Sequence, residues 1–146
     1  MTTPSVAEQN KALMRAIFAA AAAGDRSKYQ DRIADDATFT VTGEHSWSQT
    51  FRGKASIGKD LFGYVHSLLQ KGGKTEPFRF LADEDWVVVE ARGDMVTKAG
   101  IPYRNHYCLM YRLRDGVIVE MKEYQDSLMC DRILGPFPPE MRAMRP

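Results

Sequence analysis

The amino-acid sequence predicts an α+β fold, a cone-shaped α+β barrel in which N-terminal helices pack on a curved antiparallel sheet. Helical periodicity dominates residues 6–70, and the alternation typical of strands dominates residues 76–124. Helices first and strands afterwards are the pattern of α+β proteins. A curved sheet wrapped around helices leaves an apolar space between the two layers, and we expect a small ligand to bind there.

Three helices are expected before the main run of strands. Residues 6–23 carry apolar side chains at helical spacing and end before Gly24, a residue type that often caps helix C-termini. A short second helix is expected over residues 25–33, which begin with an aspartate, a favourable N-cap. Residues 56–70 place apolar side chains on one face and end before Gly72, which predicts a third, amphipathic helix.

The strands are predicted from β-branched residues and period-two alternation. Residues 37–41 alternate in this way and are followed by Gly43, so we expect an early strand there. Residues 44–52 are expected to be a polar loop. The dipeptide Asp115-Gly116 is the strongest hairpin signal of the second half. The strands expected in that half are residues 76–81, 86–97, 103–114 and 117–124.

A last helix and a Pro-rich tail complete the predicted domain. Asp126 is a favourable N-cap for a helix over residues 127–134, which Gly135 would end. A chain of 146 residues with 44% hydrophobic residues fits one domain with one core, residues 1–146. Residues 136–146 cannot extend the helix, and we expect this tail to drape over a partner or to stay disordered.

The charge balance argues against several classes of partner. The 20 basic and 19 acidic side chains give a net charge of +1. This balance provides no basic stripe for nucleic acid and no basic block for an anionic membrane. Residues 16–23, the longest apolar stretch, are too short to span a bilayer, and the N-terminus has no basic signal region. We therefore expect a soluble, cytoplasmic protein that binds neither nucleic acid nor membranes.

No metal or cofactor is expected. The histidines fall in separate predicted elements, and the cysteines lack the spacing of a zinc site or a disulfide framework. The sequence has no phosphate-binding glycine loop, no nucleophile elbow and no dinucleotide-binding fingerprint. Any chemistry should therefore be cofactor-free. The histidines are His45, His66 and His106, and the cysteines are Cys108 and Cys130.

A charged segment and a later acid carry the prediction of a catalytic site. Glu90, Arg92 and Asp94 alternate along one strand and therefore share a face. If that face lines the cone, Arg92 needs buried acidic partners, and Asp94 and a cross-strand Glu123 are the natural ones. An arginine between two acids can keep one of them ionised and leave the other as a proton donor.

Two interpretations of this charged face stay open at the level of the sequence. The apolar Trp86 and Val88 lie on the same face, which favours a half-buried pocket wall. The alternative is that the face is the solvated side of the sheet or a polar dimer interface. Tyr124 points to the face opposite Glu123, which predicts a core position for its ring.

Short motifs across nearly the whole chain resemble one superfamily. They are Ala23-Gly24-Asp25, Asp35-Asp36-Ala37-Thr38, Phe51-Arg52-Gly53, Asp115-Gly116-Val117-Ile118 and Glu123-Tyr124. On these motifs the chain is similar to the nuclear transport factor 2-like superfamily, in its SnoaL-like branch, which is related to the ketosteroid isomerases. The resemblance implies the cone fold and a homodimer that packs through the outer sheet face. Its members include isomerases, cyclases, epoxide hydrolases, dehydratases and proteins without catalysis.

Two enzyme groups of this superfamily imply different sites. The proton-transferring positions of the steroid isomerases correspond here to Ile17, Val41 and Leu109, which cannot transfer a proton, so true ketosteroid isomerase activity is not implied. The limonene-epoxide hydrolases fit in part, because their acid and arginine positions are similar to Arg92, Asp94 and Glu123. The residues that hold the attacking water in those enzymes correspond here to Phe39 and Val41.

The expected function is a cofactor-independent acid-base enzyme, of isomerase, cyclase, dehydratase or epoxide hydrolase type, acting on a small apolar oxygen-bearing metabolite. The alternatives are a non-catalytic small-molecule-binding protein and a dimeric interaction scaffold. A homodimer is also favoured because a lone sheet would expose Val87 and Val89. His66 is expected to be exposed on its helix. The predicted catalytic residues are Arg92, Asp94 and Glu123, and the predicted ligand contacts are His106, Trp47, Phe39, Val41 and Ile17.

Overall fold

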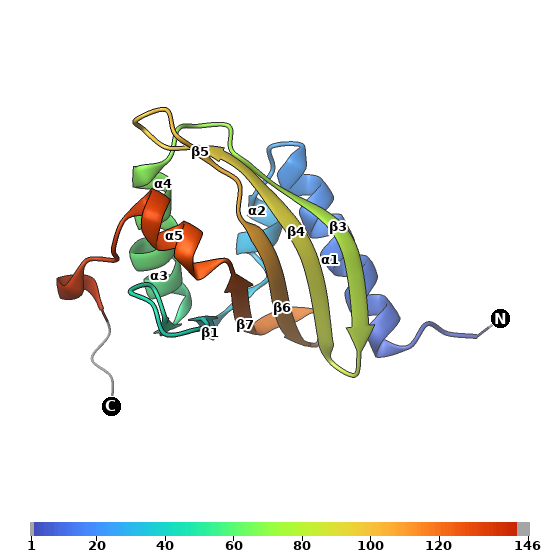
Figure 1. Cartoon of the computed structure of the whole chain (residues 1–146). Coiled ribbons are helices and arrows are strands. Elements are labelled where there is room, and N and C mark those ends of the chain that lie inside the picture. Colours follow the sequence, from blue (N-terminus) through green and yellow to red (C-terminus); the bar gives the residue numbers. More distant parts are fainter. Residues whose placement is uncertain (1, 143–146) are drawn as a thin grey trace.

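A strongly curved sheet and the helices inside its curve form the molecule (Figure 1). The computed structural model of the chain describes residues 2–142. The described strands are β1 (Ile33–Val41), β2 (Gln49–Arg52), β3 (Lys74–Asp83), β4 (Trp86–Val96), β5 (Pro102–Tyr103), β6 (His106–Arg114) and β7 (Val117–Gln125). Their order is β2-β1-β7-β6-β4-β3, and β5 pairs with β4.

The described helices overlap the segments predicted to be helical, but the second helix is shorter than the predicted residues 25–33, because β1 begins at Ile33. Ser5 caps the first helix by accepting a hydrogen bond from the Glu8 backbone, and the Glu8 side chain accepts one from the Ser5 backbone. A π-helical stretch, Ile57–Gly63, joins two short helices into one segment that covers most of the predicted helix 56–70. The helices are α1 (Val6–Ala22), α2 (Ser27–Gln30), α3 (Lys54–Ser56), α4 (Tyr64–Leu68) and α5 (Ser127–Leu134). The α+β class and the cone shape are confirmed.

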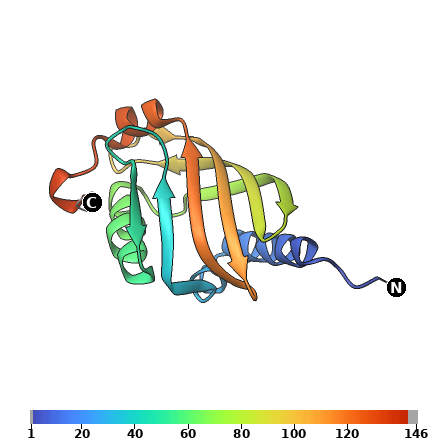
Figure 2. The same ribbon diagram turned by 90° about the horizontal axis from the view of Figure 1, so that it is seen from below.

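The first and last long strands lie side by side. The sheet curls from β3 beside α1 to β2 beside the α3–α4 segment (Figure 2). The pairing of β1 with β7 is parallel, whereas the other neighbouring strands are antiparallel. In this register Glu123 of β7 lies between Val41 of β1 and Leu109 of β6. The topology thus puts one carboxyl group in the middle of the concave face.

The two faces of the sheet correct two predictions. Val87 and Val89 are fully buried on the concave face, so the prediction that they would be exposed in a monomer is wrong. Tyr124 is 44% exposed on the convex face, so its predicted core position is also wrong. Both errors have one physical cause, which is that period-two alternation identifies two faces without saying which of them meets the helices.

An aromatic cluster holds the C-terminal segment against the body of the protein. Phe137 is fully buried, and its ring packs against Trp47, Phe51 and Tyr64 at centroid distances of 5.0 to 5.9 Å. The indole N–H of Trp47 donates to the Gly135 carbonyl at 2.9 Å. This part of the predicted tail therefore packs on its own chain, while the prediction for residues 143–146 lies outside the described residues.

Three strands differ from the sequence prediction by more than two residues. The first is β1, which begins at Ile33, four residues before the predicted start at residue 37. Residues 49–52 form an edge strand, β2, within the segment that was expected to be a loop. The predicted strand 103–114 is interrupted, because β5 ends at Tyr103 and β6 begins at His106. A fully buried Asn105 occupies the interruption.

Asn105 joins this interruption to the end of β7. Its side-chain NH₂ donates to the Tyr103 hydroxyl at 3.0 Å, to the Gln125 side-chain oxygen at 3.1 Å and to the Asp126 carbonyl at 3.0 Å. Its side-chain oxygen accepts from the backbone N–H groups of His106 at 2.8 Å and Asp126 at 3.0 Å. One buried side chain therefore satisfies polar groups from three separate segments.

Replacing Asn105 by alanine should lower the free energy of unfolding by about 2–4 kcal/mol, because several buried polar groups lose their partner. Urea unfolding followed by circular dichroism measures this change. Arg104→Ala is the matched control, since its exposed ion pair with Asp94 should contribute at most about 1 kcal/mol. Equal losses in the two variants would contradict the role assigned to Asn105.

Candidate functional site

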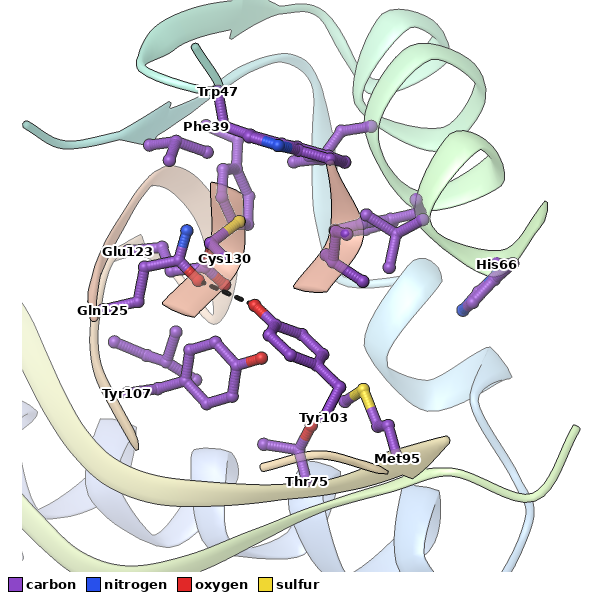
Figure 3. Close-up of a pocket in the computed structure, with 16 residues that line it drawn as sticks. Phe39, Trp47, His66, Thr75, Met95, Tyr103, Tyr107, Glu123, Gln125 and Cys130 are labelled. Atoms are coloured by element: carbon purple, nitrogen blue, oxygen red, sulfur yellow. Dashed lines mark hydrogen bonds between the residues drawn. The ribbon is translucent and has the colours of Figure 1, made fainter. Parts of the chain in front are cut away.

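A cavity lies between the concave face of the sheet and the helices (Figure 3). Its narrow end has a volume of about 140 Å³, and an adjoining wider end has a volume of about 260 Å³. The two ends share seven wall residues, among them Phe39, His66, Leu109 and Glu123. Most of the wall is apolar, so the polar groups that it does contain decide which chemistry can take place there.

Within residues 2–142, Glu123 is the only acidic residue that lines this cavity. Its neighbours on the adjacent strands, Val41 and Leu109, are apolar and cannot stabilise a negative charge. Within residues 2–142, no ion pair or side-chain hydrogen bond to its carboxyl group is present, and burial raises its pKa to about 7. A carboxyl group with such a pKa can take up or release a proton near neutral pH.

Three tyrosine side chains lie close enough to Glu123 for its charge to affect them. Burial, followed by the charge of Glu123, raises the pKa of Tyr29 and of Tyr107. Burial raises the pKa of Tyr111 as well, with the neighbouring Tyr29 and Glu123 adding to the effect. The Tyr29 hydroxyl donates to the Met121 sulfur at 3.0 Å. All three hydroxyls therefore stay protonated. The single O–H of Tyr29 is already donated to Met121, so a ligand beside Glu123 would meet its donor at Tyr107 or Tyr111.

The narrow end of the cavity has a second polar group. The Tyr103 hydroxyl donates to the Gln125 side-chain oxygen at 3.3 Å, a contact drawn in Figure 3. Asn105 supports both groups from behind the wall. The thiol of Cys130 also borders this end, and burial raises its pKa to about 11, which leaves it protonated and poorly nucleophilic.

The structure does not bring Arg92 and Asp94 together with Glu123. Arg92 and Asp94 are exposed on the convex face, whereas Glu123 lines the cavity behind the sheet. Arg92 lies over the Phe78 ring, with its guanidinium carbon 5.7 Å from the ring centroid, and Asp94 accepts a hydrogen bond from Arg104 at 3.2 Å. The predicted convergence of the three residues is therefore wrong in its geometry.

The physical reason is the burial of the alternate positions in β4. Val87, Val89 and Ala91 face the helices, so Glu90 and its charged neighbours must face outward. A signal for this was present, because the buried set contains no charge and the exposed set contains three. The apolar Trp86 on the charged face obscured that signal, since it packs beneath the cationic groups of Arg112 and Lys122.

Four of the five predicted ligand contacts border the cavity. Phe39, Val41 and Trp47 line its narrow end, and Ile17 lines its wider end. His106 lies on the convex face instead, 2.8 Å from the Glu90 carboxylate. Its predicted contact with the ligand is therefore wrong for this cavity.

Several wall residues were not predicted to contact a ligand. The sequence does not distinguish a wall tyrosine from a core tyrosine, because aromatic residues are common in strands of both kinds. His66 is exposed on its helix, as expected, but its ring also borders the opening of the cavity. The wall residues that were not predicted to contact a ligand are Tyr29, His66, Tyr103, Tyr107 and Tyr111.

Two features are absent from residues 2–142, a metal-binding cluster and a membrane-spanning helix. No group of three or more His, Cys, Asp or Glu side chains is placed to hold a metal ion. No described helix combines the length and the apolar character that crossing a bilayer requires.

Burial of Glu123 makes a prediction for stability. The folded-state pKa of about 7 exceeds the ordinary value of 4.5, so the folded chain binds the proton more tightly. The stability that Glu123 contributes is therefore complete below pH 4.5 and is lost as the pH rises to about 7. The loss amounts to roughly 3 kcal/mol, and Glu123→Gln should abolish it.

Urea unfolding of both proteins between pH 4.5 and pH 8 tests this prediction. The free energy of unfolding of Glu123→Gln, relative to the unaltered protein, should rise by roughly 3 kcal/mol across the range. Asp94→Asn provides the control, because its exposed carboxylate should give a difference within about 1 kcal/mol. A Glu123→Gln difference that does not change with pH would show that the folded chain leaves this carboxyl group unperturbed.

Comparisons with known proteins place the chain in a family. The family model for the SnoaL-like domain matches residues 14–121. No curated protein matches the chain.

Solved structures share the fold. An NTF2-like protein from Burkholderia xenovorans is 21% identical over 86% of this chain and 96% of its own, with a TM-score of 0.68. A putative isomerase from Bacillus subtilis is 23% identical over 92% and 99%, with a TM-score of 0.68. TerC, co-crystallised with polyporic acid, is 20% identical over 86% and 97%, with a TM-score of 0.70. With its family model matched over most of its length, the chain belongs to the SnoaL-like family of the NTF2-like superfamily.

Proposed function

We propose that this protein is a cofactor-independent enzyme that moves a proton within a small apolar, oxygen-bearing metabolite. The observation that carries the proposal is the Glu123 carboxyl group, which lies in an apolar cavity without a cationic partner among the described residues. Glu123 is half-buried, and a carboxyl group that lines an apolar cavity without a partner is costly for folding. Such groups are concentrated at functional sites. In this proposal Glu123 is both the base and the acid.

The surrounding hydroxyls suit the oxygen of such a substrate. Tyr29, Tyr107 and Tyr111 stay protonated and lie beside Glu123. A tyrosine O–H that donates to a carbonyl oxygen would stabilise the negative charge that develops when a proton leaves the adjacent carbon. The apolar wall strengthens that interaction, because little water competes for the donor.

The proposed reaction uses a single carboxyl group twice. The Glu123 carboxylate removes a proton from a carbon next to a carbonyl group, and the electron pair passes to the carbonyl oxygen to form an enolate. The carboxylic acid then returns the proton to another atom of the same molecule. This sequence favours an isomerase or a cyclase over an epoxide hydrolase, which must hold a water and protonate the epoxide as well.

The decisive experiment uses proton exchange rather than a known substrate. Small ketones, enones and 1,3-dicarbonyl compounds are incubated with the protein in D₂O, and NMR follows deuterium incorporation next to the carbonyl group. Glu123→Gln should lower the exchange rate by at least about 10²-fold, because glutamine cannot accept the proton. Exchange that continues at the same rate in this variant would rule out Glu123 as the base.

Two convex-face variants serve as matched controls. Arg92→Gln and Asp94→Asn alter the remaining members of the predicted cluster and should keep the exchange rate within about twofold, since neither residue lines the cavity. Loss of exchange in either variant would restore the acid-arginine mechanism expected from the sequence. Circular dichroism of each variant checks that the fold is retained.

A non-catalytic binding function is the second candidate. It is favoured by one observation, which is that the described cavity wall offers no second carboxyl group to complement Glu123. If the protein only binds its ligand, the ligand should raise the melting temperature of the protein and should be recovered chemically unchanged. Deuterium in the recovered ligand would exclude this alternative.

We also propose that the protein forms a homodimer through the convex face of the sheet. Phe78, Leu81 and Tyr124 are 49%, 57% and 44% exposed on this face. The half-buried Val88 lies opposite Leu81 in the register, which extends the apolar surface across β3 and β4. Exposed apolar surface of this kind is common at protein interfaces.

The cytoplasmic location expected from the sequence stays a prediction.

Leu81→Lys should convert such a dimer to a monomer, because the charge would have to be buried in the interface. Analytical ultracentrifugation at several protein concentrations measures the mass. Leu128→Lys changes another exposed leucine, 74% exposed on α5, and should leave the dimer intact. A monomeric unaltered protein at high concentration would refute the dimer.

A further inference from the structure

The opening of the wide end of the cavity contains an arginine without a carboxylate partner. Arg26 and His66 border this opening from opposite elements, Arg26 beside α2 and His66 on α4. An Nη1 N–H of Arg26 donates to His66 Nε2 at 3.0 Å, so the imidazole is an acceptor there. The hydrogen bond joins the two sides of the opening and holds the guanidinium at its edge.

The guanidinium is left with unused donors. An arginine has five N–H groups, and the contact with His66 uses one of them. The adjacent Asp25 carboxylate accepts from the backbone and side chain of Ser27 and makes no ion pair with Arg26 in the described residues. No ion pair to Arg26 exists within the described part of the chain.

A second basic residue near the opening, Lys74, directs its side chain to the other face of the sheet. Lys74 also borders the wide end, but its position in β3 is opposite Asp94 of β4. Residues opposite one another in a register direct their side chains to the same face, and Asp94 is exposed on the convex face. The positive charge that faces a ligand at the opening is therefore that of Arg26.

The wall between this opening and Glu123 is apolar. Ile17, Phe18, Phe62 and Leu109 line the wide end, together with the phenol groups of Tyr29 and Tyr111. Figure 3 shows His66 at the edge of the cavity, well apart from the Tyr103–Gln125 pair. A ligand that fills this space would therefore meet a cation at the solvent end and apolar side chains along its body.

We propose that Arg26, held in place by His66, binds a carboxylate at the opening of the cavity, so that the metabolite is an organic acid with an apolar body. The carboxylate stays in the solvent-exposed opening, where it needs little desolvation, and the apolar body extends toward Glu123. Arginine suits this role because its planar donors match the two oxygens of a carboxylate. The inference rests on the proposed function in that it assigns a substrate class to the same cavity.

The test compares carboxylates with matched neutral amides. Hexanoate, octanoate, 3-phenylpropanoate and cinnamate, each with its primary amide, are titrated into the full chain at pH 6 by isothermal titration calorimetry. At this pH Glu123 is largely protonated, because its pKa is about 7, and does not repel the ligand. At least one carboxylate should bind roughly tenfold more tightly than its amide, and Arg26→Gln should abolish that preference.

Lys28→Gln is the matched control for charge. Lys28 lies on α2 and does not line the cavity, so removing its charge should leave the carboxylate preference intact. Melting temperatures of both variants confirm the fold. The proposal is overturned if no carboxylate of the series binds, if acid and amide bind equally, or if the preference survives in Arg26→Gln.

A further variant separates this inference from the proposed function. Glu123→Gln should keep the carboxylate preference, because the binding group lies at the opening and the catalytic group lies inside the cavity. If Glu123→Gln retains proton exchange, the proposed function fails while the carboxylate site stands. If Arg26→Gln retains the preference, the carboxylate site fails while the proposed function stands.

Discussion

The alternation of side chains along the curved strands is the constraint on which the rest of the structure depends. Each strand turns one set of side chains toward the helices, and that set must be apolar or must find polar partners inside the protein. In β4 the inward set is Val87, Val89 and Ala91, which fully satisfies the requirement. In β7 the inward set contains Glu123, which does not.

The cost of this exception is large compared with the stability of a domain. Keeping Glu123 ionised inside the cavity opposes folding by roughly 3 kcal/mol at neutral pH, whereas small domains are stable by about 5–15 kcal/mol. A leucine between Val41 and Leu109 would carry no such cost. Folding alone therefore gives no reason for a carboxyl group at this position, and the proposed proton transfer supplies one.

The sequence predicts local features of this fold better than long-range ones. Asp115-Gly116 marks a hairpin, and the helix expected over residues 127–134 occurs as Ser127–Leu134, because turn and capping residues act within a few positions. The face of Glu90, Arg92 and Asp94 was not determined, since both sets of alternate residues in β4 contain valines. That ambiguity placed the predicted catalytic cluster on the wrong side of the sheet.

The rest of the site depends on contacts between distant segments. The parallel pairing of β1 with β7, the Arg26–His66 hydrogen bond and the Asn105 network each join residues that are far apart in the sequence. No local sequence pattern predicts such contacts, because each residue involved is of a common type for its own helix, strand or loop. The sequence predicted Glu123 as a site residue, but its separation from Arg92 became evident only from the register of the strands.

The central claim is that one uncompensated carboxyl group controls the chemistry of the cavity. The most direct test is an NMR titration of the Glu123 side-chain carboxyl carbon, with Glu123→Gln used to assign its signal. The account predicts a titration midpoint near pH 7, far above the ordinary 4.5. A midpoint at or below 4.5 would show that the group is solvated or paired in solution and would contradict the account.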